Sequence, residues 1–143
     1  MRSDTRLRLL TFVLRLSGVA LLAAFPAMFL PAEWMAATHQ RIGLGEFPRA
    51  PVVEYLTRSI AALYGFHGVL VLLVSRDPVY YRAIVSYLAV MNIAFGAMML
   101  VIDLRAGLPA VWTLLEGPPI ASLGVVLAVL NRSVGAGDVK VTR

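Results

Sequence analysis

The chain has 143 residues, of which 59% are hydrophobic and 15% are charged, and its mean hydropathy is +0.80. Soluble domains average about 45–50% apolar and about 25% charged residues, so this composition is typical of a polytopic membrane protein. The net charge of +5 does not indicate nucleic-acid binding, because no basic patch is interleaved with exposed aromatic residues. Cysteine is absent, which excludes disulfides, thiolate metal sites, iron–sulfur clusters and cysteine nucleophiles.

The first long apolar segment, residues 9–30, predicts a membrane helix. Three arginines precede it, as in a signal peptide, but Pro26 and Pro31 crowd the plausible cleavage sites, so we expect the helix to be retained. Gly18 and the alanines that follow it are small enough to allow close contact with another helix.

The connection after this helix, residues 31–50, predicts a short helix that lies in the membrane interface. Apolar residues recur in it at near-helical spacing, and Trp34 is suited to anchor it at the headgroup level. Gly43, Gly45 and Pro48 end this element, and Pro51 is suited to the first turn of the next one.

Residues 51–74, 80–103 and 109–130 predict three further helices, each able to cross a bilayer core of about 30 Å at about 1.5 Å per residue. Arg76-Asp77-Pro78 makes a tight turn, and Glu116-Gly117-Pro118-Pro119 kinks the last helix. We expect a mobile tail over 131–143. The predicted fold is all-α: one membrane domain, a transmembrane four-helix bundle with a short interfacial helix in its first outer connection.

The distribution of positive charge predicts the orientation. If both termini lie in the cytoplasm, four of the 13 Lys and Arg residues fall on the outer side, namely Arg41, Arg49, Arg58 and Arg105. The other positive residues fall on the cytoplasmic side. The positive-inside rule therefore favours an N-in, C-in protein, which we place in a bacterial inner membrane.

Five polar residues are expected at membrane depth, where each is a candidate functional group: Arg58, His67, Asn92, Asp103 and Glu116. His67 is the candidate for binding a cofactor, as a haem or metal ligand, or for relaying protons. The only other histidine is His39 in the outer connection, and no metal-ligand spacing accompanies His67. The alternative is a neutral histidine that bonds to a neighbouring helix beside Tyr64.

Glu116 has two interpretations. A carboxylate before Gly-Pro-Pro can belong to a polar cavity or gate at a broken helix, as in some transporters. Alternatively, it pairs with Arg58, which lies equally far into its own helix; we expect Arg58 to bond Glu116 or Asp103 across the bundle, with Glu54 as a rival partner. Asn92 shares a helix face with Gly96, Met99 and Asp103, and we expect it to join helices by a hydrogen bond.

No residues form a nucleophile–base pair, a phosphate-binding glycine loop, a paired-carboxylate catalytic site or a metal site, so we name no catalytic or metal-binding residue and no cofactor. The blocks LPAEWM, LTRSIAALYGFHG, VSRDP and IDLRAGLPAVWTLLEGP resemble those of small four-helix bacterial membrane proteins, loosely similar to the DoxX-like group. That resemblance implies the same fold and topology, and an association with respiratory redox complexes and quinone. It carries no catalytic signature.

Three functions remain open. The leading hypothesis is a non-enzymatic accessory or scaffolding subunit whose partners are the bilayer, other membrane proteins or further copies of itself. The second is a redox-linked subunit associated with quinone or haem. The third is a small transporter centred on Glu116.

Overall fold

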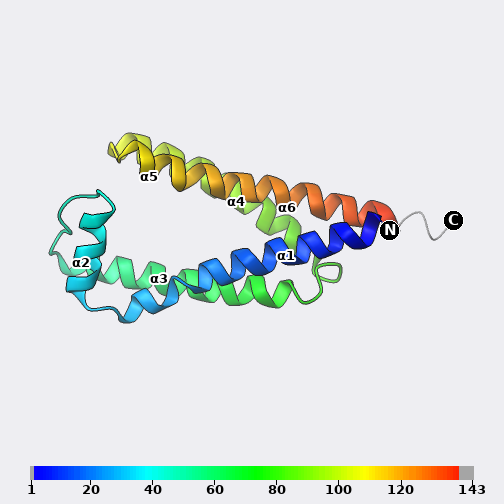
Figure 1. The fold of residues 1–143 in the computed structure, drawn as a ribbon, viewed down its shortest axis with the longest axis horizontal. Coiled ribbons are helices and arrows are strands. Elements are labelled where there is room, and N and C mark those ends of the chain that lie inside the picture. The colour runs from blue at the N-terminus through cyan, green and yellow to red at the C-terminus, as the bar shows by residue number, and fades with distance from the viewer. Residues whose placement is uncertain (1, 139–143) are drawn as a thin grey trace. The chain divides into compact units, whose positions relative to one another are not determined.

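The computed structural model describes residues 2–138, and the side chains of 4–134. This part of the chain contains helices and connections but no strands, which confirms the all-α prediction (Figure 1). The elements in chain order are α1 (Arg2–Leu22), the short 3₁₀ helix η1 (Phe25–Phe29), α2 (Ala32–Arg41), α3 (Pro51–Val74), α4 (Arg82–Ala106), α5 (Ala110–Leu115) and α6 (Gly117–Asp138).

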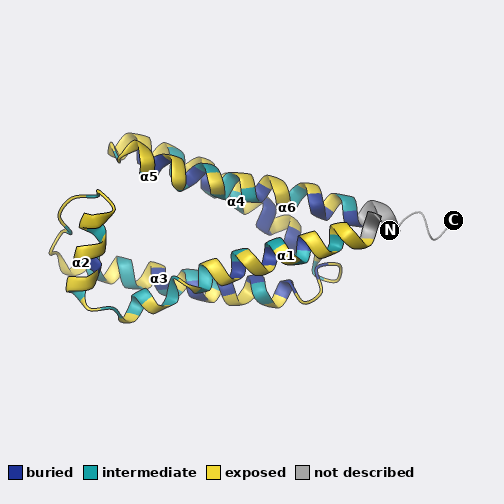
Figure 2. Cartoon of the chain, viewed as in Figure 1, coloured by how far each residue is buried: buried dark blue, intermediate teal, exposed yellow. Residues whose placement is uncertain are grey.

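Four helical segments are long and apolar enough to cross a membrane. They are Asp4–Phe29, Pro51–Val74, Arg82–Ala106 and Ala110–Val134. Figure 2 shows that much of the length of these segments is exposed, in yellow. Large apolar residues are among the exposed ones, including Phe12, Leu16, Leu63, Phe66, Val90, Met98, Val125 and Val129. Such surfaces are stable in lipid and not in water, so the chain is a multi-pass membrane protein.

The chain divides into two compact units. Unit 1 consists of Met1–Leu14 and Leu73–Arg143, and unit 2 consists of Arg15–Leu72. Unit 1 contains the start of α1 together with α4, α5 and α6. Unit 2 contains the end of α1, η1, α2 and almost all of α3.

Helix boundaries agree with the sequence prediction where prolines and glycines set them. α3 begins at Pro51 as predicted, and α2 occupies the connection expected to hold a short helix. Gly43 and Gly45, which follow α2, have positive φ angles of 83° and 82°, a conformation that glycine adopts without strain. The prediction of a tail from residue 131 is wrong up to Asp138, because α6 continues that far; residues 139–143 lie outside the described part.

Unit 2 is held together by close approach of α1 and α3 at glycines. A Cβ atom added to Gly68 would lie 2.7 Å from the Gly18 carbonyl oxygen and 2.7 Å from the Leu22 nitrogen. A Cβ atom at Gly65 would lie 2.3 Å from the ring of Phe25. Only glycine allows the backbones to come this close, which confirms that Gly18 lies at a helix contact. In Figure 1, α2 runs across the direction of α3.

Unit 1 is built on the antiparallel pair α4 and α6, which lie along one another (Figure 1). A Cβ atom at Gly96 would lie 2.5 Å from the Gly117 carbonyl oxygen, and one at Gly117 would lie 2.9 Å from the Leu100 nitrogen. A Cβ atom at Gly124 would lie 2.6 Å from the Ala89 carbonyl oxygen. These contacts fix the antiparallel register of the pair: Ala89 of α4 lies opposite Gly124 of α6, and Leu100 lies opposite Gly117.

The best-buried apolar side chains of unit 1 lie at the end where α4 begins and α6 ends. They are Leu10, Leu14, Val85, Leu88 and Leu127, each at most 1% exposed. The opposite end of unit 1 has fewer buried apolar groups and holds the break between α5 and α6. The core of unit 2 is smaller and includes Met35, Ala61 and Val71.

Candidate functional site

Arg58 is a structural link within unit 2. Its Nε and Nη2 atoms donate to Oε1 of Glu54 at 3.0 and 2.7 Å, one turn earlier on α3. Its guanidinium also donates to the Met28 carbonyl oxygen and, at 3.1 Å, to the Leu30 carbonyl oxygen. These carbonyls lie at the end of η1, just before Pro31, where the helix leaves acceptors without backbone donors. Arg58 therefore satisfies the end of the first membrane segment and ties it to α3.

Within unit 2, Arg58 pairs with Glu54, the rival carboxylate of the prediction. The predicted bond to Glu116 or Asp103, which belong to unit 1, stays a prediction. An arginine has five N–H donors in a planar fork, and each of the three nitrogens of Arg58 donates at least one hydrogen bond within unit 2. The sequence analysis omitted the unpaired carbonyls before Pro31, which compete for the same guanidinium.

His67 lies half-buried on α3 and has no hydrogen-bond partner among the described residues. Its predicted bond to a neighbouring helix therefore stays a prediction. His39 is held locally, because its Nδ1 lies 3.0 Å from the Gly45 carbonyl oxygen and its ring packs edge-on against Phe47. The haem hypothesis is tested by an absorption spectrum of the purified protein, in which absence of a Soret band would exclude bound haem.

Asn131, and not Asn92, joins two helices. Nδ2 of Asn92 donates at 2.7 Å to the carbonyl oxygen of Leu88 on its own helix, whereas we predicted a bond between helices. Nδ2 of Asn131, on α6, donates at 3.1 Å to the Arg82 carbonyl oxygen and at 2.8 Å to Oγ of Ser86, both on α4. Asn131 is 4% exposed, so both bonds are made away from solvent.

Asp103 is the least satisfied polar side chain in the described part of the chain. It is 1% exposed, and its Oδ2 is buried without a hydrogen-bond partner among the described residues. Its backbone carbonyl is well used, since it accepts the capping N–H of Gly107 and the N–H of Leu108 at 3.1 Å. The predicted protein-facing side of α4 is confirmed at Gly96 and Asp103, which are both buried.

Glu116 lies at the predicted break in the last membrane segment. It has φ −102° and ψ −78°, and it ends α5 before α6 begins at Gly117. Pro118 and Pro119 have no N–H, so the carbonyls of Leu114 and Leu115 lose the donors that a continuous helix would supply. The break, which the sequence predicted, therefore leaves backbone acceptors beside a carboxylate.

The register of unit 1 places Asp103 and Glu116 toward the same end of the α4–α6 pair. Asp103 lies one turn beyond Leu100 on α4, while Thr113 lies one turn before Gly117, on α5. Thr113 is 6% exposed and faces the same interior, and Glu116 follows it by one turn. Asp103 and Glu116 therefore lie toward the same end of unit 1. The sequence analysis named both acids but did not pair them.

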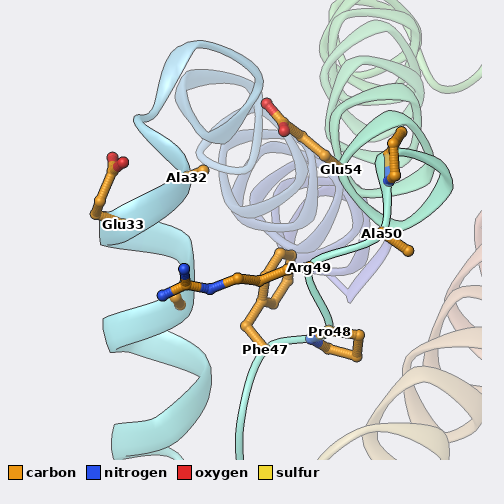
Figure 3. Close-up of a pocket in the computed structure, with 9 residues that line it drawn as sticks. Ala32, Glu33, Phe47, Pro48, Arg49, Ala50 and Glu54 are labelled. Atoms are coloured by element: carbon orange, nitrogen blue, oxygen red, sulfur yellow. The ribbon is translucent and has the colours of Figure 1, made fainter.

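Unit 2 has a cavity of about 370 Å³ between α2 and the start of α3, shown in Figure 3. Ala32 and Ala36 of α2 and Phe47 and Pro48 of the loop line it with apolar surface. Charged residues Glu33, Arg49 and Glu54 also line it, and Arg49 extends toward α2 (Figure 3). The volume is at the lower end of the range for small-molecule sites, about 300–1,000 Å³. The sequence analysis did not identify this cavity, which forms only when the loop folds back on α2.

No group of three or more His, Cys, Asp or Glu side chains in the described part of the chain is arranged to hold a metal ion. Comparison with known proteins gives no match to a protein-family model, a curated protein or a solved structure. Function is therefore argued from the geometry of the chain itself.

Proposed function

We propose that this protein is a non-enzymatic accessory or scaffolding subunit of a membrane complex. The observation that carries the proposal is the use made of Arg58 and Asn131. Both are polar groups of segments long enough to cross a membrane, and both donate hydrogen bonds to another helical segment of their own unit. Polar groups used in this way stabilise helix packing and leave apolar outer faces free for lipid or another membrane protein.

The absence of cysteine allows a direct test. Single cysteines at Leu63 and Val90, which are 64% exposed in each case, would be introduced for cross-linking in native membranes. We expect at least one exposed position to give an adduct with a partner or a second copy. A cysteine at Leu88, which is 1% exposed, is the matched control and should give none. A chain that forms no adduct at any exposed position and purifies as a lone monomer in mild detergent would contradict the proposal.

The proposed location is a bacterial inner membrane, with both termini in the cytoplasm. The distribution of Lys and Arg and the DoxX-like resemblance support it. Reporter fusions at Arg76 and after Arg132 should report the cytoplasm, and fusions near Gly45 and Gly107 should report the outer side. A fusion at Arg76 that reports the outer side would show that the proposed orientation is reversed. Fusions near Gly107 and after Arg132 that report the same side would show that α5 and α6 do not cross the membrane.

A second candidate function is a small transporter centred on Glu116. The observation that favours it is the break of the last membrane segment at Glu116, toward the same end of unit 1 as the buried Asp103. Flux would be measured in proteoliposomes for the parent chain, for Glu116→Gln and for Glu33→Gln, an exposed acid on α2. We expect Glu116→Gln alone to abolish flux. Flux unchanged by Glu116→Gln would remove this candidate.

A further inference from the structure

The cavity of unit 2 is closed by a loop that specific contacts hold in place. It lies between α2 and the first turn of α3, and residues of the 43–50 loop form one of its walls. This loop is fastened to α2 because Nδ1 of His39 lies 3.0 Å from the Gly45 carbonyl oxygen and the His39 ring packs edge-on against Phe47. All of the lining residues belong to unit 2, so the walls of the cavity are built within that unit.

The cavity lies at one end of the first two membrane segments. The first segment ends at Phe29 and the second begins at Pro51, and most of the lining comes from the connection between them. Trp34 on α2 is 64% exposed, and Tyr55 on α3 is 67% exposed. Tryptophan and tyrosine are enriched where a membrane meets water, at the level of the lipid headgroups. The cavity is therefore at the depth of phospholipid headgroups.

Arg49 and Glu54 offer opposite charges to this cavity. Figure 3 shows the Arg49 side chain extending toward α2 and Glu54 on α3. Both bonds from Arg58 end on Oε1 of Glu54, so within unit 2, where every residue is described, Oε2 accepts no hydrogen bond. Within the same unit the Arg49 guanidinium makes no hydrogen bond or ion pair. A ligand in the cavity can therefore use a guanidinium and a carboxylate oxygen together.

The balance of charge favours a zwitterion. Glu33 and Glu54 line the cavity together with Arg49, and Arg58 is bonded to Glu54, so negative and positive side chains are equal in number. A guanidinium is well suited to phosphate, which it can bind through two parallel N–H donors. A carboxylate accepts hydrogen bonds from a primary ammonium, whereas a quaternary ammonium has no N–H to donate. An anion without an ammonium group would face the carboxylates unpaired.

We propose that this cavity binds the headgroup of a zwitterionic phospholipid that carries a primary amine, with Arg49 holding the phosphate and Glu54 the ammonium. The proposal stands on the position of the cavity at the end of two membrane segments and on the complementary charges of its lining. It goes beyond the accessory role, because it assigns a lipid ligand to the chain itself.

The site is tested by native mass spectrometry of the full chain in a neutral detergent, titrated with phosphatidylethanolamine. Phosphatidylcholine, whose ammonium is fully methylated, and phosphatidylglycerol, which has a phosphate but no ammonium, are titrated in parallel. We expect one phosphatidylethanolamine per chain, bound about tenfold more tightly than either other lipid, the effect of losing one charge-assisted hydrogen bond. Equal binding of the three lipids, or tighter binding of phosphatidylglycerol, would overturn the proposal.

Substitutions locate the bound lipid. Arg49→Gln and Glu54→Gln should each weaken phosphatidylethanolamine binding by about tenfold, and a glutamine at 54 still offers Arg58 an oxygen acceptor. The matched controls are Arg41→Gln and Glu46→Gln, at exposed residues that do not line the cavity, and they should leave the affinity unchanged. Losses in the controls as large as those in the cavity variants would overturn the assignment to this cavity.

A last arm separates a lipid from a soluble ligand. Glycerophosphoethanolamine has the same headgroup without acyl chains, and it should not displace the bound lipid at equal concentration. Displacement at equal concentration would show that the ligand is a soluble phosphate ester, against the proposal. Lipid binding by a chain that forms no adduct with another protein would support this proposal and remove only the accessory role.

Discussion

Replacing Gly96 by alanine is a direct test of how α4 and α6 pack. The new Cβ would lie 2.4 Å from the Ala121 nitrogen and 2.5 Å from the Gly117 carbonyl oxygen, whereas ordinary contact begins at 3.4 Å. Both neighbours are backbone atoms and cannot rotate away, so the helices must separate by about 1 Å along this stretch. A gap of that size forfeits a quarter to a half of each van der Waals contact that it opens.

Whether Gly96→Ala raises or lowers the stability shows whether α4 and α6 are in close contact at this position. In an open helix, glycine to alanine stabilises by about 1 kcal/mol, because alanine loses less backbone entropy. Overpacking a closed contact costs about 1–3 kcal/mol, so we expect Gly96→Ala to lose about 1–2 kcal/mol net. Unfolding in a denaturing detergent, followed by circular dichroism, measures the difference. The control is Ala97→Leu on the exposed face, which should cost little. A Gly96→Ala chain as stable as the parent would refute the close approach of the two helices.

Two further predictions concern hydrogen bonds. Arg58→Gln should lower the free energy of unfolding by about 1.5–3 kcal/mol, chiefly because the bonds to the Met28 and Leu30 carbonyls are lost. A double-mutant cycle with Glu54→Gln should give a coupling energy of only about 0.5 kcal/mol, because this i,i+4 ion pair is partly exposed. A coupling energy equal to the whole loss would contradict this prediction. Asn131→Leu should lower the free energy of unfolding in detergent by about 1–2 kcal/mol, because two hydrogen bonds between α4 and α6 are lost. Asn92→Leu should lower it less, because the bond of Asn92 lies within its own helix. Equal losses would contradict the conclusion that Asn131, and not Asn92, joins the two helices.

Local chemistry made much of the fold predictable. Long uncharged segments imply membrane helices wherever they occur, and prolines and glycines end helices through their own backbone properties. The start of α3 at Pro51 and the break at Glu116 follow from those properties alone. Each is decided by a few neighbouring residues, so a single sequence was sufficient.

Partners across space could not be predicted in the same way. The hydrogen bonds of Arg58 include two to the carbonyl oxygens of Met28 and Leu30, about 30 residues away in the sequence. These oxygens come near Arg58 only after α1 and α3 pack together. Asn131 was assigned to a tail because the polar run Asn131-Arg132-Ser133 follows an apolar segment. A signal against that assignment was present: Leu127, Leu130 and Val134 continue the helical spacing of buried residues past Asn131.

The two ends of the α4–α6 pair allow a final test of which polar groups are structural. Asn131 is buried with both its donors used, whereas Asp103 is buried with Oδ2 unsatisfied by the described residues. A buried polar atom without a partner costs about 1–3 kcal/mol, so an apolar side chain of similar size at Asp103 removes a cost instead of a bond. We therefore expect Asp103→Leu to leave stability unchanged or raise it by about 1–2 kcal/mol, while Asn131→Leu lowers it. Asp103→Leu that destabilises as much as Asn131→Leu would show that Asp103 holds the helices together. Unchanged or raised stability would show that folding does not require the acid.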